Sequence, residues 1–178
     1  MRYFIGYLIE GAAGAWHREL ARRLSELFGT RKPYEKVPPH ITLVPPFDTD
    51  DIERVEVVVG ELLRQRKSPD AFRMTGFDRF GERVAFVDIR VEEAAYRVVE
   101  DLRTRIRGVV ASASGEPAYP WRPHATLADQ MTPEVMASVW EYLQHVQKPS
   151  FSLPFTVVTL FRKTDGVWVP EKSFPFGA

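Results

Sequence analysis

Apolar residues recur three or four positions apart in four segments of the chain, the spacing typical of amphipathic helices. In the first segment this spacing runs from Trp16 to Leu27, with charged residues between the apolar ones, and Gly29 ends the pattern. His17 has charged neighbours there and is expected to face solvent. The other helices are predicted over residues 52–66, 92–110 and 132–146, and His145 falls near the end of the last one.

Short runs rich in aromatic and β-branched residues alternate with these helices, a composition that favours strands. Pro45-Pro46 is expected to end the strand that contains His40, and Gly76 is a candidate β-bulge. Turns are predicted at residues 80–82 and at Asp165-Gly166, a dipeptide typical of hairpins. The predicted strands cover residues 2–9, 40–44, 72–80, 83–91, 123–127, 151–163 and 167–174.

The order of these elements contains a rough internal duplication. Each half has a strand, a helix, a second strand, a second helix and a hairpin-like pair, and the second half uses residues 84–91 as its first strand. This order predicts an α+β fold formed by a single domain, residues 1–178, with two similar lobes. Antiparallel sheets are expected to face a central cleft, with the helices outside.

A five-residue motif occurs once in each predicted half. Residues 39–43 read Pro-His-Ile-Thr-Leu, and residues 123–127 read Pro-His-Ala-Thr-Leu, so the pattern P-H-x-T-L recurs after 84 positions (124 − 40). At ordinary residue frequencies a given window matches this pattern with odds of roughly 5 in a million. The repetition therefore indicates function, because a hydrophobic core has no reason to contain the same polar pair twice.

The motif suits acid–base chemistry on a phosphate. Positions two apart in a strand point to one face, so His40 lies beside Thr42 and His124 beside Thr126. If the two strands are neighbours, all four side chains line one groove. Imidazoles titrate near pH 7 and can act as general acid and base, while threonine hydroxyls can donate to phosphate oxygens.

Composition excludes several other classes of protein. Lysine and arginine number 24 and aspartate and glutamate 24, so no long nucleic-acid footprint is indicated. The chain has no cysteine, which excludes disulfides, thiolate catalysis and cysteine-based zinc sites. No third ligand lies at a characteristic spacing for zinc, so neither a metal nor another cofactor is expected. Without a signal-like or membrane-spanning run, we expect a soluble cytoplasmic protein that does not associate with membranes.

With its two His-x-Thr-x tetrapeptides, His40–Leu43 and His124–Leu127, the sequence resembles the 2H phosphoesterase superfamily, also called LigT or 2′-5′ RNA ligase-like proteins. The resemblance spans nearly the whole chain in element order. It implies a bilobal fold with pseudo-twofold symmetry and a metal-independent phosphodiesterase that opens 2′,3′-cyclic phosphates. It also implies that His40 donates a proton and His124 accepts one, and that the protein can reversibly join RNA ends through a 2′-5′ bond.

The resemblance leaves the substrate open. In the LigT branch an arginine often follows the second motif closely, whereas Ala128-Asp129-Gln130 follows it here. An RNA 3′ end, a small cyclic nucleotide, ADP-ribose cyclic phosphate and a 2′-5′ oligoadenylate all belong to the wider group. We expect a monomer acting on one of these.

Residues that flank the motifs are further candidates for substrate contacts. Phe47, Tyr119 and Trp121 could stack on a base or cover the strand ends, and Arg122 could contact a phosphate or be solvated. The alternative function is a non-catalytic module that binds an AMP-like nucleotide or an RNA end in the same groove. The presence of both histidines favours catalysis.

Overall fold

The computed structural model describes residues 1–110 and 120–177. The helices in these ranges are α1 (Gly11–Phe28), α2 (Ile52–Arg64), α3 (Glu93–Arg107) and α4 (Pro133–His145), with a short 3₁₀ turn, η1 (Pro33–Glu35). The strands are β1 (Arg2–Leu8), β2 (His40–Asp48), β3 (Phe72–Phe80), β4 (Val84–Arg90), β5 (His124–Ala128), β6 (Ser152–Leu153), β7 (Val157–Thr164) and β8 (Val167–Pro175). None of the helices in these ranges is long and apolar enough to cross a membrane.

The strands form two antiparallel four-stranded sheets. One sheet has the order β2-β1-β7-β8 and the other β5-β4-β3-β6. Each motif strand, β2 or β5, is therefore an edge strand, and the two edges contact each other. The sheets correspond at their motif edges, with β4 next to β5 as β1 is next to β2. The third strand of the first sheet, β7, comes from the second half of the chain.

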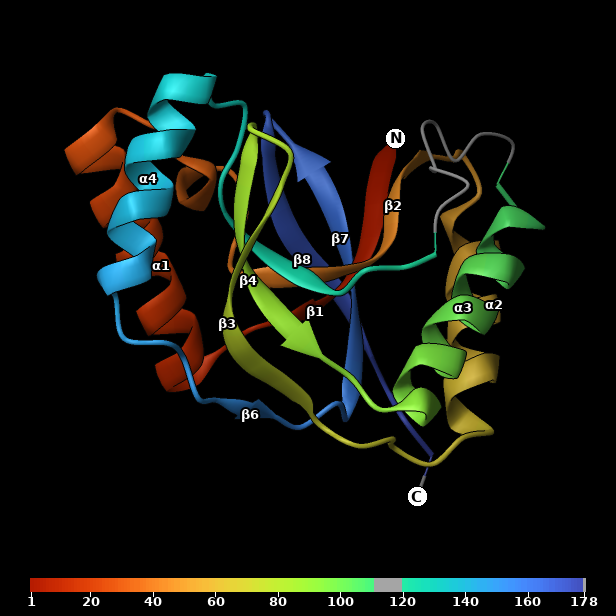
Figure 1. The fold of residues 1–178 in the computed structure, drawn as a ribbon. Coiled ribbons are helices and arrows are strands. Elements are labelled where there is room, and N and C mark those ends of the chain that lie inside the picture. The colour runs from red at the N-terminus through yellow and green to blue at the C-terminus, as the bar shows by residue number, and fades with distance from the viewer. Residues whose placement is uncertain (111–119, 178) are drawn as a thin grey trace.

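Pairs of helices cover the outer sides of the sheets (Figure 1). Helices α1 and α4 contact each other on one side of the molecule, and α2 and α3 contact each other on the opposite side. The helices cross between the halves of the chain, because α1 packs against β5 while α3 packs against β2. The helix that follows β1 thus covers the motif strand of the other sheet, β5, and the helix that follows β4 covers the motif strand β2.

Local sequence explains most element boundaries. Gly29 ends α1 in the left-handed conformation, with φ 64°, and Thr132 caps α4 through its hydroxyl, which accepts from the Val135 amide. Gly76 lies at a register shift between β3 and β4, which confirms the predicted bulge. Asp165 and Gly166 both have positive φ and form the predicted hairpin.

Two predicted boundaries are wrong. Strand β2 continues through Pro45 and Pro46 to Asp48, because an edge strand needs main-chain donors on one side only and a register shift with β1 absorbs the prolines. The single strand predicted over residues 151–163 is divided into β6 and β7 around Pro154. The two pieces pair in different sheets, β6 with β3 and β7 with β1.

Candidate active site

The four motif side chains lie on one face of their strands, as predicted. Ile41 and Leu43 are fully buried, whereas His40 and Thr42, which alternate with them, are partly exposed. Strand β5 has the same alternation, with Ala125 and Leu127 buried and His124 and Thr126 partly exposed. The apolar face of each strand packs into the core, and the polar face remains accessible.

The two imidazoles have equivalent hydrogen bonds. Nδ1 of His40 lies 2.9 Å from the main-chain oxygen of Pro38, and Nδ1 of His124 lies 2.8 Å from that of Arg122. A carbonyl oxygen can only accept, so each Nδ1 must carry a hydrogen. In the neutral ring the Nε2 atom then keeps its lone pair, so both histidines present the atom that can exchange a proton with a substrate.

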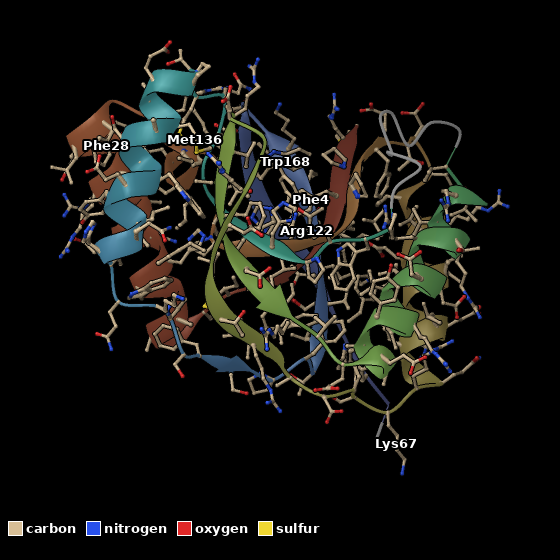
Figure 2. The ribbon with its side chains drawn as sticks, in the orientation of Figure 1. Phe4, Phe28, Lys67, Arg122, Met136 and Trp168 are labelled. Carbon is tan, nitrogen blue, oxygen red and sulfur yellow. The ribbon has the colours of Figure 1, made fainter. Side chains whose placement is uncertain are left out.

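Each imidazole also contacts a pair of phenylalanine rings. The His40 ring lies 4.9 Å from Phe4 and 6.0 Å from Phe161, while the His124 ring lies 4.9 Å from Phe80 and 5.1 Å from Phe86. Phe4 occupies β1 and Phe86 the equivalent strand β4. Figure 2 shows Phe4 in the middle of the molecule, close to the labels of Arg122 and Trp168. These rings restrict the orientation of both histidines and remove water from one side of each.

The aromatic surroundings lower the pKa of both histidines. The pKa of His40 is lowered to about 4, mainly by burial; the hydrogen bond to the Pro38 oxygen opposes this shift, and the positive charge that His124 can carry adds to it. Burial also lowers the pKa of His124, with a smaller contribution from the Arg122 guanidinium. Both rings are therefore neutral at pH 7 in the unliganded protein. The effect of His124 on the pKa of His40 shows that they belong to one electrostatic site.

A cleft of about 760 Å³ lies beside the motif strands. It is lined by Thr42 and His124 of the motifs and by two arginines, Arg103 and Arg122. Apolar and proline side chains form the rest of its wall: Leu43, Pro45, Phe80, Pro120 and Trp121. Such a volume and lining are typical of a site for a small organic ligand.

Arg122 lies at the His124 end of this cleft. Its guanidinium is 5.2 Å from the ring centroids of Phe80 and Phe86, the rings that contact His124, and it is hydrogen-bonded to Asp78. The structure therefore holds the Arg122 guanidinium beside the second motif, in an ion pair with Asp78.

The aromatic candidates lie in different environments. Phe47 is fully buried and its ring stacks 6.2 Å from Tyr3, so of its two expected roles the structure favours packing in the protein and contradicts stacking on a base. Trp121 lines the cleft, but its ring packs on Phe72 and Tyr96 and is 8% exposed. Tyr119 lies outside the described residues.

His17 does not face solvent, so that prediction is also wrong. It lies on the buried face of α1, which packs on β5, and neither ring nitrogen has a hydrogen bond of good geometry among the described residues. Its pKa is lowered to about 4, mainly by burial; main-chain groups of Ala125 and Thr126 lie near enough to oppose this shift, and the charge that His40 can carry adds to it. The charged residues Arg18 and Glu19 next to it lie on other faces of the helix, so the neighbours in sequence gave a misleading signal.

Sequence reasoning missed the phenylalanines behind the histidines and Arg103. Phe4 and Phe86 could have been found by aligning the first strand of each half, because they occupy matching positions relative to the helix that follows. Arg103 carried no such signal, because an arginine within an amphipathic helix is usually solvated. Within residues 1–110 and 120–177, no group of three or more histidine, aspartate or glutamate side chains is placed to hold a metal ion.

Comparison with known proteins places this geometry in a family. The sequence model of the 2′-5′ RNA ligase superfamily matches residues 12–166, most of the chain. The chain belongs to this superfamily. The resemblance seen in the two motifs is thereby confirmed.

Individual relatives support the same assignment. A protein of Bacillus pumilus (strain SAFR-032) named "Putative phosphoesterase" is 26% identical over 149 residues, which cover 81% of this chain and 82% of that protein. The structure of TT0787 from Thermus thermophilus has a TM-score of 0.61 at 21% identity, over 99% of this chain and 98% of that one. E. coli LigT complexed with 3′-AMP has a TM-score of 0.60 at 16% identity, over 98% and 97% of the two chains. These solved structures share the α+β fold.

Proposed function

We propose that this protein is a phosphodiesterase that hydrolyses a 2′,3′-cyclic phosphate on ribose by two-histidine acid–base catalysis, and that the same groups would give 2′-5′ ligation if an RNA 5′-hydroxyl attacked in place of water. The observation that carries the proposal is that His40 and His124 are oriented by equivalent hydrogen bonds. In each ring Nδ1 is bonded to a main-chain oxygen, and Nε2 is left to exchange a proton. The superfamily and the phosphoesterase relative support it.

In the proposed reaction a water oxygen attacks the phosphorus and one ribose oxygen leaves. One imidazole takes the proton from the water, and the other gives a proton to the departing ribose oxygen, so the product is a ribose phosphomonoester. By resemblance His40 is the donor and His124 the acceptor. Because its pKa is lowered to about 4, His40 would act as donor only after the anionic substrate has raised that pKa. No step requires a metal ion.

The other groups would stabilise the charge on the phosphate. The hydroxyls of Thr42 and Thr126 lie on the same faces as the histidines and would donate to the non-bridging oxygens. Arg122 would neutralise the same charge from the His124 end of the cleft. Donors held in place before the substrate binds avoid the cost of reorientation during the reaction.

The proposal is tested by hydrolysis of 2′,3′-cyclic AMP and of a short RNA with a 2′,3′-cyclic end, in the presence of EDTA. We expect turnover by the wild-type protein and a loss of about 10²- to 10⁴-fold in kcat for His40→Ala and for His124→Ala. His145→Ala is the matched control, because His145 is exposed at the end of α4 and remote from the motif strands. Turnover unchanged in both motif variants would overturn the mechanism. A folded protein that binds AMP without turnover would identify it as a nucleotide-binding module instead.

A p-nitrophenyl ester of a nucleoside 3′-phosphate would distinguish the acid from the base. In this ester the 2′-hydroxyl attacks the phosphorus and p-nitrophenolate leaves without a proton, so the reaction needs a base for the 2′-hydroxyl but no acid for the leaving group. The group that protonates the 2′ oxygen when the cyclic phosphate is opened is the one that removes its proton in this reaction, so the proposed roles predict that His124→Ala keeps most of the wild-type rate and that His40→Ala does not. Retention by His40→Ala alone would reverse the two roles.

A further inference from the structure

Arg103 is a buried cation in the wall of the cleft, and the proposed reaction does not use it. Its side chain is 6% exposed, and Nη1 donates a hydrogen bond of 3.1 Å to Glu100. It projects from α3, the helix that packs on β2, and lines the same cleft as Thr42, Arg122 and His124. A guanidinium has five N–H donors in a planar fork, so it can bind more than one partner at a time.

The pseudo-symmetric half of the molecule lacks this cation. The chain enters α1 after β1 and α3 after β4 with the same spacing, so Ala21 is the counterpart of Arg103, and Ala21 is fully buried. Helix packing of this kind therefore accepts a small apolar side chain at this position. A buried arginine costs several kcal/mol of desolvation that an apolar side chain avoids. The difference between the halves argues for a role in the cleft, in addition to the bond with Glu100.

Two arginines from different elements line the cleft, Arg103 paired with Glu100 and Arg122 paired with Asp78. A cyclic phosphate carries a single negative charge, which the motif hydroxyls and Arg122 at the His124 end can stabilise. The rest of the cleft wall is apolar and includes Leu43 and Trp121. A volume of about 760 Å³ suits a whole nucleotide and not only the ring that is opened.

We infer that Arg103 binds a second phosphate of the substrate, on the 5′ side of the ribose that carries the cyclic phosphate. The inference rests on the proposed function, which places the cyclic phosphate between the two motifs. It narrows the substrate class to cyclic phosphates with a 5′-phosphoryl group, either a 5′-phosphorylated nucleotide or an RNA end with its preceding linkage. Simple nucleoside 2′,3′-cyclic phosphates would be poor substrates in comparison.

Binding of reaction products tests this inference separately from turnover. Calorimetric titration of the wild-type protein with adenosine 3′,5′-bisphosphate and with adenosine 3′-phosphate should give a Kd about 10- to 100-fold lower for the bisphosphate, the range for a charged hydrogen bond. A dinucleotide with a 3′-phosphate distinguishes a 5′-phosphorylated nucleotide from an RNA end, because its second phosphate is the diester linkage of an RNA chain and not a 5′-phosphomonoester. Equal affinity of all three ligands would overturn the inference.

Variants assign the effect to Arg103. We expect Arg103→Met to lose the preference for the bisphosphate while its affinity for adenosine 3′-phosphate changes little, and Arg103→Lys to keep part of the preference. Arg105→Met is the matched control, because Arg105 lies on the same helix and is exposed, paired with Asp101. Thermal unfolding checks that each variant folds; if Arg103→Met does not, Arg103→Lys must still reduce the preference. A preference that persists in Arg103→Lys and Arg103→Met, or that is lost equally in Arg105→Met, would overturn the assignment.

These outcomes separate the inference from the proposed function. If the wild-type protein hydrolyses 2′,3′-cyclic AMP with and without a 5′-phosphate at equal kcat/KM, the inference fails while the proposed function stands. If it hydrolyses neither but prefers the bisphosphate, the proposed hydrolysis fails while the second phosphate site stands.

Discussion

The indole Nε1–H of Trp121 donates a hydrogen bond of 2.9 Å to the main-chain oxygen of Thr42. Trp121 lies three residues before His124, and Thr42 lies at the centre of the first motif. Because β2 and β5 belong to different sheets and share no ladder of main-chain hydrogen bonds, this bond connects β2 to the segment that leads into β5. It fixes the spacing of the two motifs from within the wall of the cleft.

Trp121→Phe should lower both stability and activity. The variant keeps an aromatic ring but removes the donor to the Thr42 oxygen, which should cost about 1–3 kcal/mol in the free energy of unfolding. We also expect kcat/KM to fall about 10-fold or more, because small displacements of catalytic groups are costly. Urea denaturation and the cyclic phosphate assay measure the two effects. Trp140→Phe is the control, since Trp140 lies on α4 and its ring packs against the Arg79 guanidinium. Equal effects in both variants would contradict a special role for Trp121.

The pH profile of kcat/KM should have its maximum on the acid side of pH 6.5. This quantity reports the unliganded enzyme, in which one histidine must be protonated and the other neutral, so the maximum lies between their two pKa values. Both values are lowered from 6.5, that of His40 to about 4. The profile of kcat should lie at higher pH, because the bound anion raises both pKa values. A kcat/KM maximum above pH 7 would contradict the lowered pKa values of the two histidines.

His17→Leu should stabilise the protein. At neutral pH the leucine fills the site without two unpartnered nitrogens, and about 1–3 kcal/mol is expected from removing such groups. The pKa of His17 is about 4 in the folded protein and 6.5 in the unfolded chain, so the unfolded chain binds more protons between these values. Wild-type stability should thus fall as the pH is lowered from about 6.5 toward 4.

The same measurement has an internal control. His17→Leu should lose less stability than the wild type over this pH range, by up to about 3 kcal/mol at pH 4. His145→Leu replaces an exposed histidine and should follow the wild-type curve. If the two variants and the wild type all show the same pH dependence in urea denaturation, His17 is not the titrating group.

Gly6→Ala should disturb the first motif. A Cβ atom at Gly6 would lie 3.0 Å from the main-chain oxygen of Ile41 and from the Phe4 ring, and 3.3 Å from the Phe161 ring. These groups flank His40, so we expect a loss of about 1–3 kcal/mol in unfolding free energy together with reduced turnover. Gly60→Ala in α2 is the control, because its nearest neighbours lie at 3.8 Å and a helical alanine should stabilise by about 0.5–1 kcal/mol. Full activity in Gly6→Ala would show that the strand can yield without moving His40.

The motif strands were predictable because their information is local. The alternation of His40 and Thr42 with Ile41 and Leu43 determines which face is buried, and repetition of the pattern indicates that both polar faces belong to one site. Gly76 and Asp165-Gly166 were also recognisable, since each is a residue type that its backbone conformation favours.

The errors concern residues whose environment is set by distant parts of the chain. His17 and Phe47 are buried because β5 and Tyr3 happen to pack on them, and neither contact is visible from neighbours in sequence. The extension of β2 through two prolines depends on its being an edge strand, a property of sheet order and not of the segment. Arg103 was missed for the same reason, because only the position of α3 on β2 directs it into the cleft.

The crossing of α1 and α3 between the sheets means that the two halves of this chain are intertwined. Each half supplies the histidine of one motif and the helix that shields the other half's motif strand from solvent. A break in the hairpin between β3 and β4 would therefore leave each fragment with an apolar strand face uncovered, so neither histidine could be held in place until the fragments had reassociated. Although the sequence contains a rough internal duplication, its two halves are not independent folding units, and the two motif histidines come together only when the whole chain has folded.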